Sequence, residues 1–303
     1  MIDDMIVAVS RLLVVPHDYW ALARVSTSLH ALLSSRPVLA PMNARYFQPW
    51  RAVKYNGHRL EDVAEQTPEL CLMAVACEAC VLRYVREQTP ELCRVAVTGD
   101  GRALQYVNEQ TPEICLAAVR TNGWALDFVR EQTHEICLAA VTTYGYALRY
   151  VKEQTPALCL AAVMKSGPAL VYVKERTHKI CLAAVRQEGD ALYHIKEQTR
   201  DLCLAAVTQR GTALKHVREQ TPAICLAAVM QNGYALGFVD AQTPEICLAA
   251  VTQRGRALQF VKEQTLEICL AAVTQDDFAL RFVEERLLAA VNEKSPRAVR
   301  YVK

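Results

Sequence analysis

The sequence predicts an all-α fold, an α-solenoid of short helix-turn-helix repeats with a small helical element at its N-terminus. One observation is a nine-residue phrase, Thr-Pro-Glu-Ile-Cys-Leu-Ala-Ala-Val at 111–119, which returns in variant form every 22 residues. A second is that ten cysteines keep the same step. Fixed periods of roughly 20–50 residues are typical of repeat architectures. Ten threonines mark the repeats: Thr67, Thr89, Thr111, Thr133, Thr155, Thr177, Thr199, Thr221, Thr243 and Thr265.

The first half of each repeat predicts a buried helix. We number each repeat from its threonine as position 1, where the hydroxyl can cap a helix by accepting from a free N–H of the first turn. Proline, which the start of a helix tolerates, follows in six of the ten repeats. In the repeat 111–132, Glu113 suits the first turn. Ile114–Val119 is apolar on every side, so we expect this helix to be covered on every side.

The second half of each repeat predicts a turn and a shorter helix. Position 13 is glycine in eight repeats, such as Gly123, which predicts a left-handed helix stop. We expect a second helix of about eight residues from Trp124 to about Glu131, with position 14 as its first residue, where Pro168 stands in one repeat. Helices this short persist only when they are stacked. A leucine-rich repeat has a similar period, but its L-x-L strand pattern is absent from the sequence.

Charge and cysteine usage narrow the class of protein. Lys plus Arg is 34 and Asp plus Glu is 32, which favours neither nucleic acid nor an anionic membrane as partner. No apolar run reaches the ~18 residues that span a bilayer. Ten of the twelve cysteines stand at position 5, inside the predicted buried helix. Stacked helices lie ~8–10 Å apart and a disulfide needs Cα atoms within ~7 Å, so we expect free thiols and a reducing, intracellular compartment.

Residues 1–44 do not follow the repeat and predict two helices, Met5–Val15 and Tyr19 to about Ser34. They resemble an F-box, although the family's opening Leu-Pro pair is missing. The matching residues are Asp4, Ile6, Leu12, Leu13, Pro16, Asp18, Leu22, Val25, Ser26 and Leu29. The resemblance implies docking to a Skp-type linker of a cullin ubiquitin ligase through Leu12, Leu13, Leu22 and Val25. A plain cap that shields the first repeat from water fits the same residues.

The array is predicted to occupy residues 45–303. It comprises a degenerate first repeat at 45–66, ten 22-residue repeats at 67–286 and a degenerate C-terminal cap at 287–303. The pattern Leu-Ala-Ala-Val-x-Gln-Asn-Gly-x-Ala-Leu-x-Tyr/Phe, at 226–238 and nearly so at 248–260, resembles an uncharacterised repeat family of giant DNA viruses of amoebae and some intracellular bacteria. That resemblance implies the fold and a setting in the host cytoplasm or the virion, and it implies no activity.

The variable positions of the repeat are the candidates for binding. Positions 8, 9 and 16 are Ala, Val and Leu in all ten repeats, whereas positions 12, 14 and 17 change freely. Positions 14 and 17 share a helix face. Aromatic and arginine side chains are the usual anchors of protein recognition, and neutral variation of surface positions is the alternative. The candidate partner-binding residues are Trp124, Tyr146, Arg149, Tyr193, Tyr234, Arg256, Phe278 and Arg281.

Motifs for chemistry are missing. A basic row at position 20 is offset by glutamate at position 21, which argues against nucleic acid. Cys77-Glu-Ala-Cys80 has no second pair at zinc spacing, and His194 and His216 stand where other repeats carry Tyr or Phe. We therefore expect no metal and no cofactor.

We also find no phosphate loop or nucleophile elbow, so we expect no enzyme activity. The function expected is a non-enzymatic protein–protein interaction scaffold, in its sharper form an F-box-like substrate adaptor. The alternative is a structural virion or capsid-associated protein.

Overall fold

The computed structural model describes residues 52–53 and 55–294, which form an all-α solenoid. Each repeat contributes an α-helix and then a six-residue 3-10 helix (η), and the described ranges hold no strand. The α-helices are α5 Pro68–Cys77, α6 Pro90–Gly99, α7 Pro112–Thr121, α8 His134–Thr143, α9 Pro156–Lys165, α10 His178–Gln187, α11 Arg200–Gln209, α12 Pro222–Gln231, α13 Pro244–Gln253, α14 Leu266–Gln275 and α15 Glu285–Lys294. The 3-10 helices are η3 Gly57–Asp62, η4 Ala79–Tyr84, η5 Gly101–Tyr106, η6 Gly123–Phe128, η7 Gly145–Tyr150, η8 Gly167–Tyr172, η9 Gly189–His194, η10 Gly211–His216, η11 Gly233–Phe238, η12 Gly255–Phe260 and η13 Asp277–Phe282.

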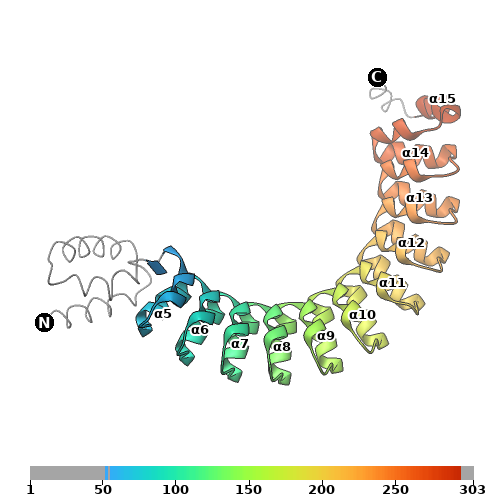
Figure 1. The fold of residues 1–303 in the computed structure, drawn as a ribbon. Coiled ribbons are helices and arrows are strands. Elements are labelled where there is room, and N and C mark those ends of the chain that lie inside the picture. The colour runs from blue at the N-terminus through green and yellow to red at the C-terminus, as the bar shows by residue number, and fades with distance from the viewer. Residues whose placement is uncertain (1–51, 54, 295–303) are drawn as a thin grey trace, which may run out of the picture. The chain divides into compact units, whose positions relative to one another are not determined.

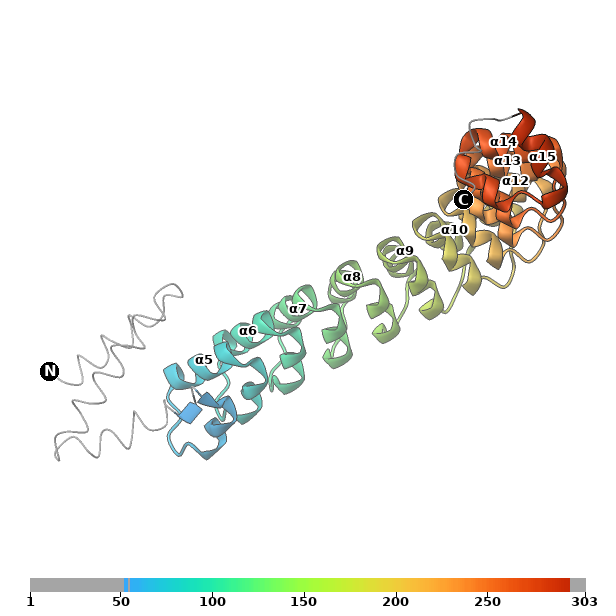
Figure 2. The ribbon, with the colours of Figure 1, turned by 90° about the horizontal axis from the view of Figure 1, so that it is seen from above.

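The chain divides into two compact halves, Met1–Ala139 and Ala140–Lys303. In the N-terminal half α5 packs against α6 and α6 against α7, while in the C-terminal half each α-helix from α9 to α15 packs against the next (Figure 1). The 3-10 helices of each half contact one another in the same order and form a second row (Figure 2). The predicted N-terminal helices, with Leu12, Leu13, Leu22 and Val25, lie outside the described residues.

The threonine at position 1 caps the α-helix, as the sequence predicts. The Thr221 hydroxyl accepts a hydrogen bond from the Ile224 N–H at 3.4 Å, and the same bond forms in every repeat except the one that opens with Thr199. Pro222 stands at the start of α12, where a backbone N–H would have no partner within the helix. The N–H that proline lacks is therefore not missed there. These local signals determine where each α-helix begins.

The core is one set of small and branched apolar side chains repeated along the solenoid. In the repeat 221–242 the buried apolar side chains stand at positions 4, 5, 8, 9, 15, 16 and 19: Ile224, Cys225, Ala228, Val229, Ala235, Leu236 and Val239. The alanines and Leu236 are 0% exposed. Full burial of a leucine-sized side chain stabilises the fold by roughly 1.5–3 kcal/mol. Because these residues face the helices of adjacent repeats, no repeat can bury its core alone.

The glycine at position 13 has another role than the predicted left-handed stop. No described glycine has a positive φ. A Cβ added to Gly233 would lie 2.5 Å from the carbonyl oxygen of Ala250 in the next repeat. Glycine is therefore needed because two backbones approach each other, and the feature that demands it is repeat stacking.

The second helix is shorter and tighter than predicted, since it is a 3-10 helix that begins at position 13 and ends at position 18. The glutamine at position 22 of the preceding repeat bonds to its end. Gln154 Nε2 donates to the Tyr172 carbonyl at 2.9 Å, and its Oε1 accepts from the Lys174 N–H at 3.0 Å. Gln154 Nε2 also donates to Leu148 O of its own repeat, at 3.3 Å. The backbone groups that would extend the helix are thus bound by a side chain.

The cysteines match their prediction in this structure: none of the twelve forms a disulfide, and the ten at position 5 are buried. Position-5 thiols donate to the position-22 glutamine oxygen of the preceding repeat, as Cys269 Sγ does to Gln264 Oε1 at 3.4 Å. Burial raises the pKa of nine of these ten thiols, such as Cys247, and raises that of Cys269 to about 11. Such thiols are weak nucleophiles and serve as small apolar core residues.

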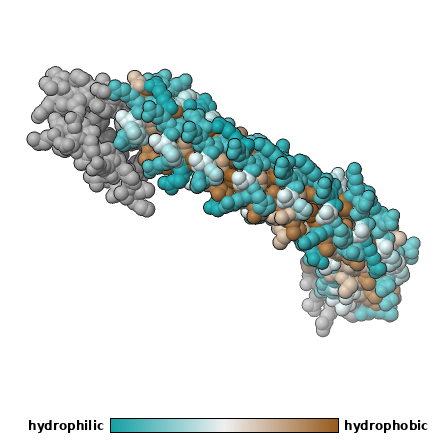
Figure 3. Space-filling view, turned by 90° about the horizontal axis from the view of Figure 1, so that it is seen from below, coloured by the Kyte–Doolittle hydropathy of each residue, from teal (hydrophilic) through white to brown (hydrophobic). Residues whose placement is uncertain are grey.

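The surface is mixed rather than apolar. The face in Figure 3 is covered mainly by hydrophilic side chains, with hydrophobic ones visible between them. Within the described ranges, no helix has both the length and the apolar character needed to cross a bilayer. The last helix of the described residues, α15, begins at Glu285, two residues before the predicted start of the C-terminal cap.

Candidate functional site

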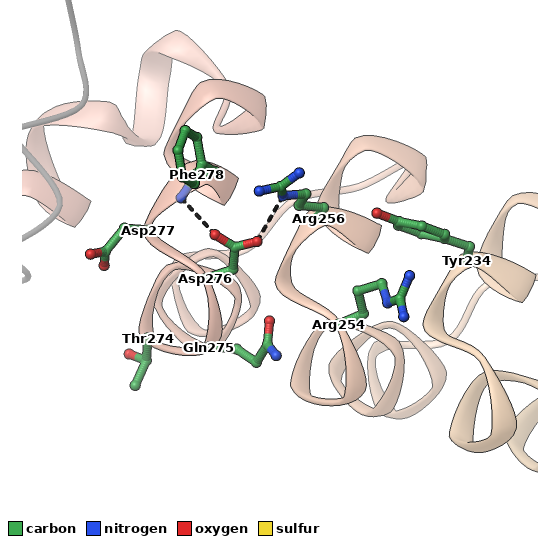
Figure 4. A pocket seen from close by; sticks show the side chains of 8 residues that line it. All are labelled: Tyr234, Arg254, Arg256, Thr274, Gln275, Asp276, Asp277 and Phe278. Atoms are coloured by element: carbon green, nitrogen blue, oxygen red, sulfur yellow. Dashed lines mark hydrogen bonds and ion pairs between the residues drawn. The ribbon is translucent and has the colours of Figure 1, made fainter.

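A groove of about 570 Å³ lies near the end of the C-terminal half, across three successive repeats (Figure 4). Tyr234 belongs to η11, Arg256 to η12 and Phe278 to η13, all at position 14. Arg254 and Asp276 stand at position 12, just before their 3-10 helices. The complete lining is Tyr234, Arg254, Arg256, Thr274, Gln275, Asp276, Asp277 and Phe278.

Asp276 organises one wall of the groove. It is the extended residue that precedes η13, and its Oδ1 accepts the Phe278 N–H at 3.0 Å. Its Oδ2 accepts from Arg256 Nε at 2.8 Å, so one carboxylate orients both an aromatic and a guanidinium (Figure 4). Both partners are partly exposed, and such a pair contributes at most about 1 kcal/mol. The role of Asp276 is to position its neighbours.

Each arginine of the groove lies over an aromatic ring. The Arg256 guanidinium is 4.9 Å from the centre of Phe278, and that of Arg254 is 4.7 Å from the centre of Tyr234. Tyr234 itself packs edge-on against Phe260, with ring centres 6.0 Å apart. Stacking on rigid rings holds the guanidinium planes in fixed orientations.

Arg254 is the group left available to a ligand. Among the described residues no carboxylate forms an ion pair with it, whereas Arg256 is held by Asp276. Asp277 also lines the groove but is directed away from both arginines in Figure 4. A guanidinium binds a carboxylate or phosphate through two parallel hydrogen bonds. The groove therefore suits an anionic group that arrives beside an aromatic or aliphatic surface.

The structure separates the predicted residues into groups. Tyr234, Arg256 and Phe278 meet in the groove. Tyr146 and Arg149 both reach Tyr172, at 6.0 Å and 5.6 Å from its ring centre.

The other predicted residues stand apart. Tyr193 is 68% exposed and lies edge-on to His194 and His216, at 5.2 Å and 5.3 Å. Trp124, on η6, is half-buried, and Arg281, on η13, is exposed; neither lines the groove.

The two histidines sit as packed aromatic side chains beside Tyr193. Burial lowers the pKa of His194, and the charge of Arg176 lowers it further. Burial also lowers the pKa of His216, followed by Lys215, while Asp190 opposes the shift. Their half-buried rings occupy the place of the Tyr and Phe rings of other repeats.

Sequence reasoning missed the position-12 side chains Arg254 and Asp276, and also Gln275 at position 11. Free variation at position 12 is visible in the sequence and is the signal that could have found the first two. Their contacts depend on the distance between repeats: Arg256 and Asp276 are 20 residues apart and touch only after stacking.

Residues 111–154 match a family described as a domain of unknown function, DUF4116. The matched segment is the pair of repeats that begin at Thr111 and Thr133. No curated protein and no solved structure matches the chain. The match agrees with the repeat boundaries and assigns no chemistry.

Proposed function

We propose that this protein is a non-enzymatic protein–protein interaction scaffold whose groove at Tyr234–Phe278 receives an acidic side chain of a partner protein. The observation that carries the proposal is Arg254, a guanidinium stacked on Tyr234 and without an ion pair among the described residues. Aromatic and arginine side chains in a hollow are the usual anchors of protein recognition.

The contacts of the basic row favour a protein over a nucleic acid as partner. Arg86 Nη1 donates to the Ala64 carbonyl of the preceding repeat at 2.8 Å, and Arg218 Nη1 makes the matching bond to Lys196 O at 2.8 Å. Lys262 Nζ does the same with Asp240 O at 2.9 Å. These side chains join adjacent repeats, so they do not form a free track for phosphates.

The test is selection from a random peptide library displayed on phage, with the purified chain as bait. Peptides that bind should carry Asp or Glu beside an apolar residue. Exchanging that acid for Asn or Gln should weaken binding about 10–100-fold, because one charge-assisted hydrogen bond is worth ~1.5–3 kcal/mol. Arg254→Ala should abolish the enrichment.

Arg210→Ala is the matched control, because Arg210 also stands at position 12 but is paired with Asp190 at 2.8 Å. The Arg210→Ala variant should select peptides with the same enrichment in Asp and Glu as the parent protein. Enrichment of neutral peptides, or acidic enrichment that survives Arg254→Ala, would contradict the proposal.

The two sharper functions rest on the resemblances described above. The adaptor form needs residues 1–44 to bind a Skp-type linker, and the structural form places the solenoid in a virion. Titration of a purified linker separates them: micromolar binding that Leu13→Asp with Leu22→Asp abolishes supports the adaptor. Absence of binding to a chain shown to be folded refutes it.

A further inference from the structure

Three side chains with metal-ligand chemistry meet at the start of the described array. His58 lies in η3, Glu78 precedes η4 and Cys80 is the second residue of η4. Each can offer one ligand atom, and these atoms all lie within 4.8 Å of one another. His58 Nε2 is 3.4 Å from Glu78 Oε1, which is 3.2 Å from Cys80 Sγ.

Two of these separations, from Glu78 Oε1 to His58 Nε2 and to Cys80 Sγ, are close to the edges of a tetrahedral zinc site. With zinc bonds of about 2.0–2.1 Å to nitrogen or oxygen and about 2.3 Å to sulfur, tetrahedral angles place nitrogen ~3.4 Å and sulfur ~3.6 Å from the oxygen. His58 Nε2 and Cys80 Sγ lie within 4.8 Å of each other, and rotation of these partly exposed side chains would close the remaining distance. His58 and Glu78 are each 45% exposed, so an ion can enter from solvent.

The Tyr84 hydroxyl already orients the histidine ring. His58 Nδ1 lies 3.1 Å from the Tyr84 hydroxyl, to which Arg83 Nη2 donates at 2.7 Å. When Nδ1 carries the proton and donates to that hydroxyl, the lone pair of Nε2 faces Glu78. Metal-binding histidines nearly always have such a partner on the other ring nitrogen.

We propose that His58 Nε2, Glu78 Oε1 and Cys80 Sγ form a Zn²⁺ site, with water in the fourth position. Cys80 binds as the thiolate, and its proton passes to solvent. One thiolate and one carboxylate then neutralise the divalent ion, so the nearby Arg83 meets no net positive charge. The site is independent of the groove at Tyr234–Phe278 and requires no partner protein.

The experiment is a titration of the full-length chain with Co²⁺ and then Zn²⁺, in a buffer with a non-chelating reductant. One Co²⁺ per chain should produce thiolate-to-cobalt charge-transfer absorption, which Zn²⁺ removes by displacement. His58→Ala and Cys80→Ser should each weaken binding more than 100-fold. Tyr84→Phe should weaken it about 10–100-fold, because the His58 ring loses the hydroxyl that holds its other nitrogen.

Cys77→Ser is the matched control, because Cys77 is an exposed cysteine in the same repeat whose sulfur lies outside the cluster. It should bind Co²⁺ as the parent does. Circular dichroism and melting establish that every variant is folded. Absence of charge-transfer absorption in the folded parent, or equal binding by Cys80→Ser, would overturn the proposal. Loss of binding in Cys77→Ser would overturn this ligand set.

Discussion

The glutamine at position 22 joins its own repeat to the next through three hydrogen bonds. Gln154 bonds the Leu148 carbonyl of its own repeat and the Tyr172 carbonyl and Lys174 N–H of the next. In one repeat Arg176 stands at this position and keeps a single bond of this kind, to the His194 carbonyl at 2.7 Å. Each backbone group left without its partner costs about 1–3 kcal/mol when water cannot reach it.

Gln154→Leu should therefore lower the free energy of unfolding by about 2 kcal/mol, and Arg176→Gln should raise it by about 1 kcal/mol. The gain is expected because Gln would restore an acceptor for the Lys196 N–H. Urea denaturation followed by circular dichroism measures both. A Gln154→Leu variant as stable as the parent would show that this glutamine does not hold the repeats together.

At the scale of elements, the distance between two repeats is set by the contact of position 13 with position 8 of the next repeat. A Cβ on Gly233 would meet the backbone oxygen of Ala250 at 2.5 Å and the Cβ of Arg254 at 3.0 Å. A Cβ on Gly237, in the same 3-10 helix, would first meet the side chain of Phe260, at 3.1 Å. A ring can shift, whereas a helix backbone cannot move without displacing its repeat.

Gly233→Ala should destabilise the fold by about 3 kcal/mol, the upper range for overpacking. Gly237→Ala should change stability by less than about 1 kcal/mol, because it reduces only the freedom of the unfolded chain. Thermal melting of the two variants in parallel makes the comparison. Equal melting temperatures would mean that the repeats can move apart at no cost.

At the scale of the whole molecule, buried thiols make stability depend on alkaline pH. Burial raises their pKa above the ordinary value of 9.0, for Cys269 to about 11. Between these values the unfolded chain loses thiol protons that the folded chain retains. The stabilisation of the folded state that comes from this pKa difference is therefore fully present below pH 9 and is lost as the pH rises toward 11.

The urea midpoint should fall between pH 9 and pH 11, and it should fall less in Cys269→Ala, whose side chain cannot titrate. Comparing the two proteins separates this effect from the titration of other groups. A parent midpoint that stays constant to pH 11, or identical slopes for the two proteins, would contradict the burial of the thiol.

The sequence by itself determined the period, the starts of the α-helices and the burial of the position-5 cysteines. Each follows from residues within one repeat: Thr221 caps α12 three residues before its partner, and Cys225 lies among apolar neighbours of its own helix. Helix capping and helical periodicity depend on residues that are close together in the chain, so the sequence alone is enough to predict them. The family match over 111–154 covers two repeats of this period and adds no function.

Only the tertiary structure decided the features that depend on the neighbouring repeat. The second helix is 3-10 because Gln154 takes the Tyr172 carbonyl 18 residues away. The glycine at position 13 is required by a backbone in the next repeat, and Arg256 meets Asp276 across 20 residues. Equal spacing in the sequence does not state how far apart the repeats lie or how they are rotated. Those two quantities decide which side chains touch, and they are set by the packing of the buried Ala, Val and Leu residues.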